Sequence, residues 1–282
     1  MNGIAANLKP EYFKAKDFRL VSGEILPEMV VEYTTLGEPK RNARGEIENA
    51  LLWCHGWSGS YIQGPTLYGK AFGPGRPLDP DRFYIICPSA LGSPGSSSPS
   101  SSGLGPDFPR YTIADMVQAQ HLLLTRHLGV THLRGIAGGS MGGHQTLQWI
   151  CDHPDFMDWA IPIATGPSST GRVVGIWGLM SETIKADPAY RGGHYAEQPK
   201  DALRRAFMGT YLWYFAPAYY QLEYRSPEAV MKGLEDAGMG NASADANDVI
   251  WRNNAMISFN VENKLHSVKA KTLVVGVNDD AL

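Results

Sequence analysis

The fold of this chain is decided by Thr131-His-Leu-Arg-Gly-Ile-Ala-Gly138, which runs directly into Gly139-Ser140-Met141-Gly142-Gly143. The first part is an apolar run that predicts a short strand, and the residues after it predict a helix that ends near His153. The serine therefore stands in a sharp turn from strand to helix. Such a turn strains the backbone of the serine, and glycines two residues away avoid a clash, so Gly138 and Gly142 mark it.

Other apolar runs surround this turn and predict further strands. They are bounded by glycine, proline or acidic residues, which is typical of buried strands in a parallel sheet. A helix is expected between two of them, beginning at Thr112-Ile-Ala-Asp115 and closed by Gly129. The alternation predicts an α/β fold with a mostly parallel sheet covered on both faces. The predicted strands lie at residues 28–35, 50–54, 82–87, 158–165 and 270–277.

The chain divides into three parts by composition. Residues 1–167 form the first part of the α/β core, and residues 168–256 are helical and aromatic, which predicts a lid inserted into that core. Residues 257–282 return to the core with the last strand, which we expect to be buried. Inside the first part, the serine-rich residues 92–105 predict a flexible loop that borders a site.

The composition excludes several classes of protein. The chain has 282 residues, of which 43% are hydrophobic and 19% charged, so it is not disordered. Its net charge of −3 does not favour nucleic acid as a partner. No apolar run is long enough for a membrane span or a secretory signal, so we expect a cytoplasmic protein. No metal-binding spacing is evident, since His121 and His127 are six residues apart.

Ser140 is the residue that this pattern favours as a nucleophile. At the end of the strand its hydroxyl would project outward, and the helix beneath it would offer free N–H groups to an oxyanion. The N–H of Met141 is one expected donor, and the N–H of Trp57 is the other, because Gly56 lets the chain turn after the neighbouring strand. The alternative is a glycine-rich turn that serves only close packing. A dinucleotide-binding loop is not favoured, because the glycines are not in the G-x-G-x-x-G register.

An acid and a base should follow Ser140 in the chain. Asp279 and Asp280 stand just beyond the last predicted strand, where the acid of a catalytic triad belongs. Apart from His55 in the turn before Trp57, the chain has seven histidines, none of which suits the base by position, and packing or surface roles are the better interpretation for them. We therefore expect the catalytic histidine beyond Leu282, together with a further strand and helix that residues 1–282 lack.

With these residues in place, the chain resembles the homoserine O-acetyltransferase family of the α/β-hydrolase superfamily. The resemblance covers most of the chain and is densest at residues 51–153. It implies an acyl-enzyme on Ser140, an acid at Asp280, a helical lid and a possible homodimer. It rests on Cys54-His-Gly56, Leu78-Asp-Pro-Asp-Arg-Phe-Tyr84, Asp107-Phe-Pro109, Thr112-Ile-Ala-Asp-Met116 and Gly138-Gly-Ser-Met-Gly-Gly143.

The chain departs from that family at positions that concern the substrate. The usual His-Ala-Leu-Thr-Gly reads His55-Gly-Trp-Ser-Gly59, and the usual methionine after the nucleophile turn is His144. We therefore expect a serine esterase that acts on a small-molecule ester or thioester with a small acyl group, and that needs no cofactor. One alternative is acetyl transfer from acetyl-CoA to homoserine or a similar alcohol. A second is a hydrolase-fold protein that binds without catalysis.

Overall fold

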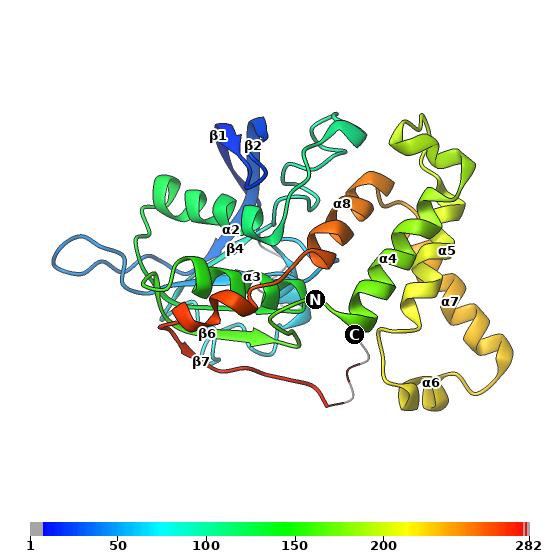
Figure 1. Ribbon diagram of the computed structural model, residues 1–282. Helices are drawn as coiled ribbons and strands as arrows, with labels where there is room; N and C mark the ends of the chain where they lie inside the picture. The colour runs from blue at the N-terminus through cyan, green and yellow to red at the C-terminus, as the bar shows by residue number, and fades with distance from the viewer. Residues whose placement is uncertain (1–7, 279, 281–282) are drawn as a thin grey trace.

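A mostly parallel sheet forms the centre of the protein (Figure 1). The structure is a computed structural model that describes residues 8–278 and residue 280. Within these residues the sheet has seven strands in the order β1-β2-β4-β3-β5-β6-β7. β2 pairs antiparallel with β1 and β4, and all later neighbours pair parallel. The strands are β1 (Glu11–Arg19), β2 (Ile25–Leu36), β3 (Ala50–Cys54), β4 (Tyr84–Pro88), β5 (Leu133–Gly139), β6 (Met157–Ile163) and β7 (Lys271–Thr272).

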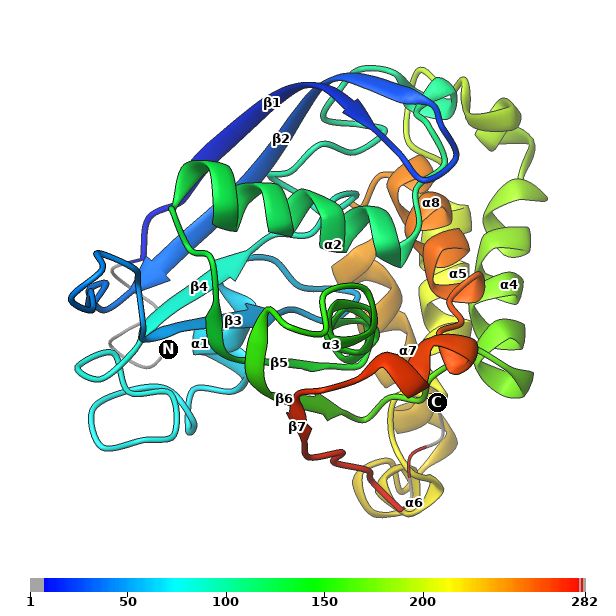
Figure 2. The same ribbon diagram turned by 60° about the vertical axis from the view of Figure 1, so that its left-hand side comes forward.

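The helices form two groups around this sheet. α2 and α3 lie side by side on one face, and α4 to α8 stand together at one side of the sheet (Figures 1 and 2). α4 to α8 all follow β6 and precede β7 in the chain. The α-helices are α1 (Gln63–Leu67), α2 (Ile113–Leu122), α3 (Met141–Asp152), α4 (Gly171–Lys185), α5 (Lys200–Tyr211), α6 (Pro217–Glu223), α7 (Pro227–Asn241) and α8 (Ala246–Ile257). Short 3₁₀ segments lie at Gly105–Asp107, Pro188–Gly193 and Glu262–Ser267, and Leu123–His127 is a π-helical turn.

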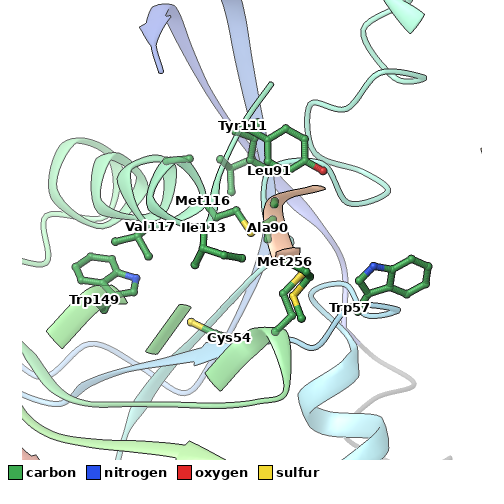
Figure 3. Packing of buried hydrophobic residues seen from close by; sticks show 14 of the residues in the cluster. Cys54, Trp57, Ala90, Leu91, Tyr111, Ile113, Met116, Val117, Trp149 and Met256 are labelled. Atoms are coloured by element: carbon green, nitrogen blue, oxygen red, sulfur yellow. The ribbon is translucent and has the colours of Figure 1, made fainter. Parts of the chain in front are cut away.

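β3 shows why the central strands have continuous apolar runs. Successive side chains point to opposite faces of a sheet, so both sets are buried only when both faces are covered. Leu52 and Cys54 belong to the larger apolar core with α2 and α3, and Leu51 and Trp53 belong to a smaller core on the other face. Figure 3 shows part of the larger core, where residues of α2 such as Met116 lie with Cys54. The predicted two-sided burial is confirmed for this strand.

Helix α2 begins where its sequence predicts. The Thr112 hydroxyl accepts a hydrogen bond from the Asp115 N–H at 3.4 Å, and the Asp115 carboxylate accepts one from the Thr112 N–H at 2.8 Å. This is a capping box, which satisfies two N–H groups that the helix itself leaves unpaired. The helix changes to the π-helical turn after Leu122 and the chain reverses at Gly129, whose φ is 68°.

The serine-rich segment 92–105 is ordered by its own hydroxyls, so the prediction of a flexible loop is wrong. The Ser97 hydroxyl accepts from the Val30 N–H at 2.8 Å, and the Ser96 hydroxyl donates to the Ser89 carbonyl at 2.7 Å. Ser98 and Ser100 donate to the Asp248 carboxylate of α8 at 3.1 and 2.6 Å. Serine composition alone suggests flexibility, but these hydroxyls are partnered and fasten the loop to β2 and α8.

The edges of the sheet differ from the sequence prediction in two ways. β1 is not among the predicted strands, because five of its nine residues are charged and it lies mostly exposed. The final segment 270–277 is a strand only at its start and is exposed, whereas we expected a buried strand. Leu273 and Val274 are 60% and 62% exposed, because β7 pairs with β6 and no other described strand lies beyond it. Among the described residues, no helix is long and apolar enough to cross a membrane.

Candidate active site

Ser140 lies in the turn between β5 and α3 with a strained backbone. Its φ of 54° and ψ of −119° are unusual for a residue with a side chain, and such strain costs roughly 1–3 kcal/mol. Surrounding hydrogen bonds hold it there. The Ser140 N–H donates to the Ile163 carbonyl at 2.9 Å, and the Ser140 carbonyl accepts from the N–H groups of Gly143 and His144 at 2.8 and 3.1 Å. Ser140 is exposed although the residues around it are buried.

The glycines around Ser140 leave no room for a side chain. A Cβ on Gly138 would lie 2.4 Å from the Gly142 carbonyl oxygen, and a Cβ on Gly142 would lie 2.1 Å from the Cys54 carbonyl oxygen. Both distances are far inside van der Waals contact. Strand β3 thus passes so close to the turn that only glycine fits at these two predicted positions.

Two further glycines are equally restricted, although the sequence pattern did not single them out. A Cβ on Gly139 would lie 2.3 Å from the Tyr68 hydroxyl oxygen. A Cβ on Gly143 would lie 2.5 Å from the Thr165 Cγ2. These contacts come from segments far away in the sequence, so local spacing could not reveal them.

Met141 and Trp57, the expected oxyanion donors, flank the Ser140 turn. Met141 is the first residue of α3, where backbone N–H groups have no partner within the helix. Trp57 lies in a turn closed by a hydrogen bond from the Gly59 N–H to the Gly56 carbonyl at 2.9 Å. A Cβ on Gly56 would lie 3.3 Å from the carbonyl oxygen of Gly139, so this turn packs against the peptide before Ser140. The oxyanion role of both N–H groups stays a prediction.

Helix α8 holds Trp57 from two sides. The Trp57 indole N–H donates to Asn253 Oδ1 at 2.9 Å, and Arg252 Nη1 donates to the Trp57 carbonyl at 2.9 Å. The Arg252 guanidinium also lies over the Trp57 ring, 5.0 Å from its centroid, and Trp177 stacks on that ring at 5.2 Å. Burial lowers the pKa of Arg252, and a second hydrogen bond to the Gly92 carbonyl at 2.8 Å stabilises this buried charge. The two hydrogen bonds to Trp57 join residues almost 200 positions apart, and nothing in the sequence pattern indicated them.

His55 stabilises the same turn as a neutral side chain. Its Nδ1 lies 2.7 Å from the Gly56 carbonyl oxygen, and its Nε2 accepts a hydrogen bond from the Ala90 N–H at 2.8 Å. Burial lowers the pKa of His55 to about 4. Because both ring nitrogens are used in holding loops together, His55 is a structural residue rather than a base for Ser140.

A cavity of about 320 Å³ opens next to Ser140, and Asp280 lines it. The Ala164 N–H donates to the Val275 carbonyl at 2.8 Å, which brings the segment after β7 to the end of β6 and hence to Ser140. The predicted nucleophile and the predicted acid therefore face one cavity. Asp279, the other candidate for the catalytic acid, lies outside the described residues. The lining includes Ser140, His144, Thr165, Val173, Trp177, Met256 and Asp280.

His144 is the histidine that lines this cavity within the described residues. It is 5% exposed, its ring stacks on Phe259 at 4.2 Å, and burial lowers its pKa to about 4. A histidine with so low a pKa is a poor general base near neutral pH. The position of the catalytic histidine stays a prediction. Among the described residues, no three His, Cys, Asp or Glu side chains are grouped to hold a metal ion.

The aromatic residues of α5, of α6 and of the segment between them do not line the cavity. Tyr211, Phe215, Tyr219 and Tyr220 contact one another, with ring centroids 4.2–6.2 Å apart. All four rings are half-buried or exposed. The apolar lining comes instead from Val173 and Trp177 of α4 and from Met256 of α8.

The fold is that of an α/β hydrolase. Residues 49–179 match the family model described as alpha/beta hydrolase fold. An acetylester hydrolase from Corynebacterium glutamicum has a similar structure, with a TM-score of 0.85 and 28% identity, over 97% of this chain and 81% of that one.

Sequence comparison defines the family more closely. A probable acyltransferase of Methanothermobacter thermautotrophicus is 41% identical over 95% of this chain and 82% of its own length. A homoserine O-acetyltransferase of Methanosphaera stadtmanae is 31% identical over 98% of this chain, which spans 64% of that enzyme. The chain belongs to the homoserine O-acetyltransferase-like family of α/β hydrolases, and it is an acyl-transfer enzyme of that fold.

Proposed function

We propose that the protein hydrolyses carboxylic esters with small acyl groups through an acyl-enzyme on Ser140. The observation that carries this proposal is the exposed, strained Ser140 at the edge of a cavity of about 320 Å³ that Asp280 also lines. A cavity of this size suits a small ligand. The buried Trp177 and Met256 give it an apolar wall that limits the access of water.

The proposed reaction has two steps. In the first, the Ser140 Oγ attacks the ester carbonyl while its proton passes to a histidine base, which Asp280 orients. The oxyanion accepts hydrogen bonds from the Trp57 and Met141 N–H groups, and the alcohol leaves with the proton from the histidine. In the second step, water attacks the acyl-Ser140 ester through the same proton transfers and releases the carboxylic acid. The reaction needs no redox or metal cofactor.

Hydrolysis is preferred to transfer for two reasons. The chain departs from the homoserine O-acetyltransferase pattern after β3 and at His144, next to the nucleophile. The structural similarity to an acetylester hydrolase supports the same choice.

Transfer of an acetyl group from acetyl-CoA to an alcohol is the second candidate function. It is favoured by the similarity to a probable acyltransferase at 41% identity. The first step would be the same, with the thiol of coenzyme A leaving in place of an alcohol. In the second step an alcohol such as the hydroxyl of homoserine, rather than water, would attack acyl-Ser140.

Two assays on the same preparation separate these functions. We expect release of p-nitrophenol from p-nitrophenyl acetate, labelling by a fluorophosphonate probe, and loss of both in Ser140→Ala. The second assay supplies acetyl-CoA with homoserine and measures free coenzyme A and O-acetylhomoserine. O-Acetylhomoserine formation without significant ester hydrolysis would overturn the esterase proposal in favour of transfer. A chain that neither reacts with the probe nor turns over either substrate would overturn both.

A further inference from the structure

The cavity next to Ser140 contains buried polar atoms that have no partner. Among the described residues, His144 Nδ1 and Thr165 Oγ1 are both buried without a hydrogen bond, and both residues line the cavity. A buried polar group without a partner costs roughly 1–3 kcal/mol, so two at one place are unusual unless a ligand satisfies them. Neither residue has a role in the acyl-transfer steps described above.

The position of His144 is fixed by its surroundings. It lies one helical turn after Ser140, and its N–H donates to the Ser140 carbonyl at 3.1 Å. The stack on Phe259 at 4.2 Å, with an angle of 25° between the rings, restricts rotation of the imidazole. Thr165 is held against the same turn, because its Cγ2 packs against Gly143, where a Cβ would lie only 2.5 Å away. Two hydrogen-bonding groups are thus held in place beside the nucleophile.

The chemistry of these groups defines what they bind. Because burial keeps His144 neutral, its imidazole offers one donor and one acceptor, and the Thr165 hydroxyl offers both as well. A hydroxyl group matches such partners, since it also donates and accepts. A carboxylate would use only the donors of these groups, whereas a hydroxyl can pair with a donor of one group and an acceptor of the other.

The depth of the cavity indicates whether this hydroxyl belongs to the acyl group or to the alcohol of the ester. Ser140 is exposed, whereas His144 is 5% exposed, so the cavity deepens from the nucleophile toward His144. The leaving alcohol must depart to solvent after the first step, while the acyl group stays attached to Ser140. The deep end therefore suits the acyl group.

We infer that His144 and Thr165 form a polar subsite that selects acyl groups with a hydroxyl at the α or β carbon. The expected effect of this subsite on catalysis rests on the proposed esterase function, whereas its expected binding preference does not. A site built to hydrogen-bond a hydroxyl discriminates strongly against an analogue that lacks it, because the polar groups of the site are then left buried and unpaired.

The catalytic test compares pairs of p-nitrophenyl esters in which a hydroxyl replaces a methyl group. The pairs are β-hydroxybutyrate with isovalerate, and lactate with isobutyrate, each corrected for its rate of spontaneous hydrolysis. In the wild-type protein we expect kcat/KM to favour the hydroxyl ester of at least one pair by roughly tenfold or more. His144→Phe keeps the ring stack but should abolish this preference, and Thr165→Val should reduce it. The exposed His194→Phe is the matched control and should leave the preference unchanged.

A binding test separates failure of the subsite from failure of the esterase proposal. In the Ser140→Ala protein, the dissociation constants of methyl β-hydroxybutyrate, methyl lactate and their methyl-for-hydroxyl analogues are measured by ligand-observed NMR. Tighter binding of a hydroxyl ester, lost when His144→Phe is added, supports the subsite even if no ester is turned over. Equal affinities within both pairs, or a preference that persists in folded His144→Phe, would overturn it.

Discussion

The turn around Ser140 and the helical group α4 to α8 contribute to the same site by different physical means. In the turn, backbone atoms of β3 and α3 approach so closely that only glycine fits, as at Gly142, where a Cβ would lie 2.1 Å from the Cys54 carbonyl oxygen. In the helical group, single side chains such as Arg252 and Asn253 reach across to Trp57. Backbone crowding restricts residue types locally, and a long-range side-chain contact leaves no local pattern.

The largest expected effect separates the chemical role of the turn from its structural role. We predict that Ser140→Ala lowers kcat for p-nitrophenyl acetate by at least roughly 10³-fold, because the acyl-enzyme cannot form. Thermal unfolding should show a folded protein, since alanine removes only the hydroxyl. Steady-state kinetics and circular dichroism measure both.

Ser168→Ala is the matched control for this prediction. Ser168 lines the same cavity, but its hydroxyl donates to Glu262 at 2.6 Å. We expect it to retain activity within a few fold of the wild type. If the two variants lost activity equally, Ser140 would not be the nucleophile.

A pair of glycine substitutions tests the comparison directly. Gly142→Ala places a methyl group 2.1 Å from the Cys54 carbonyl oxygen, so β3 or α3 must move, and we predict destabilisation by about 3 kcal/mol or more. In Gly178→Ala, within α4, the new methyl group would meet no atom within 4 Å. Because alanine favours helix more than glycine does, that variant should gain about 0.5–1 kcal/mol.

Urea unfolding of both glycine variants measures these free energies. Opposite signs are the expected outcome, with the turn intolerant and the helical group tolerant. A Gly142→Ala protein as stable as the wild type would show that β3 and α3 separate more easily than their contacts indicate.

Removing Arg252 tests whether the helical group acts on the turn. Arg252→Ala leaves the buried carbonyls of Trp57 and Gly92 without their donor, so we predict a loss of about 2–4 kcal/mol in the free energy of unfolding. In Arg252→Lys, which keeps a charge but cannot make both bonds in the same geometry, kcat should fall more than KM rises, because the Trp57 N–H shifts. Arg172→Ala is the control, because its guanidinium lies over the exposed Trp213 and should contribute less than about 1 kcal/mol.

If kcat and KM in Arg252→Lys stayed at wild-type values while stability fell, Arg252 would hold the helices together without positioning the turn. Restored kcat at low temperature, where the variant is fully folded, would lead to the same conclusion. The kinetics therefore decide between a positioning residue and a purely structural one.

The sequence predicted those features that backbone geometry imposes. β3 was predicted at residues 50–54 and lies at Ala50–Cys54, because its buried run is apolar on both faces. Whether a neighbouring element covers a strand does not follow from the sequence of that strand. The apolar run after Ala270 has the composition of a buried strand, yet Leu273 and Val274 are exposed at the edge of the described sheet. Composition reports which residues favour burial, not whether a neighbour covers them.

The candidate site, like the fold, could be predicted only in part. Ser140 was predicted from its place at a strand end, and the same reasoning left Asp279 and Asp280 both open as the acid until the family resemblance favoured Asp280. Ser140 and Asp280 line one cavity. His144 was interpreted as a packing or surface residue, since a single histidine on a helix carries no spacing signal. Its buried, unpartnered Nδ1 became visible only when Phe259 and Thr165 were placed around the same turn.

The smallest expected effect concerns the helices behind the turn. His121 of α2 and His153 after α3 stack with ring centroids 4.3 Å apart. Burial, and secondly the neighbouring His153, lowers the pKa of His121 to about 4, and burial lowers the pKa of His153 as well. Between pH 6.5, the ordinary value, and pH 4, the unfolded chain therefore binds more protons than the folded one.

It follows that the free energy of unfolding is highest above pH 6.5 and falls as the pH drops toward 4. Burial also lowers the pKa values of His55 and His144, so His121 and His153 account for only a part of this slope. His121→Phe, which keeps an aromatic ring against His153, should make the slope shallower, whereas the exposed His194→Phe should not change it. Urea unfolding at several pH values measures the slope, and an equal slope in His121→Phe and wild type would show that His121 is protonated as easily in the folded protein as in the unfolded chain.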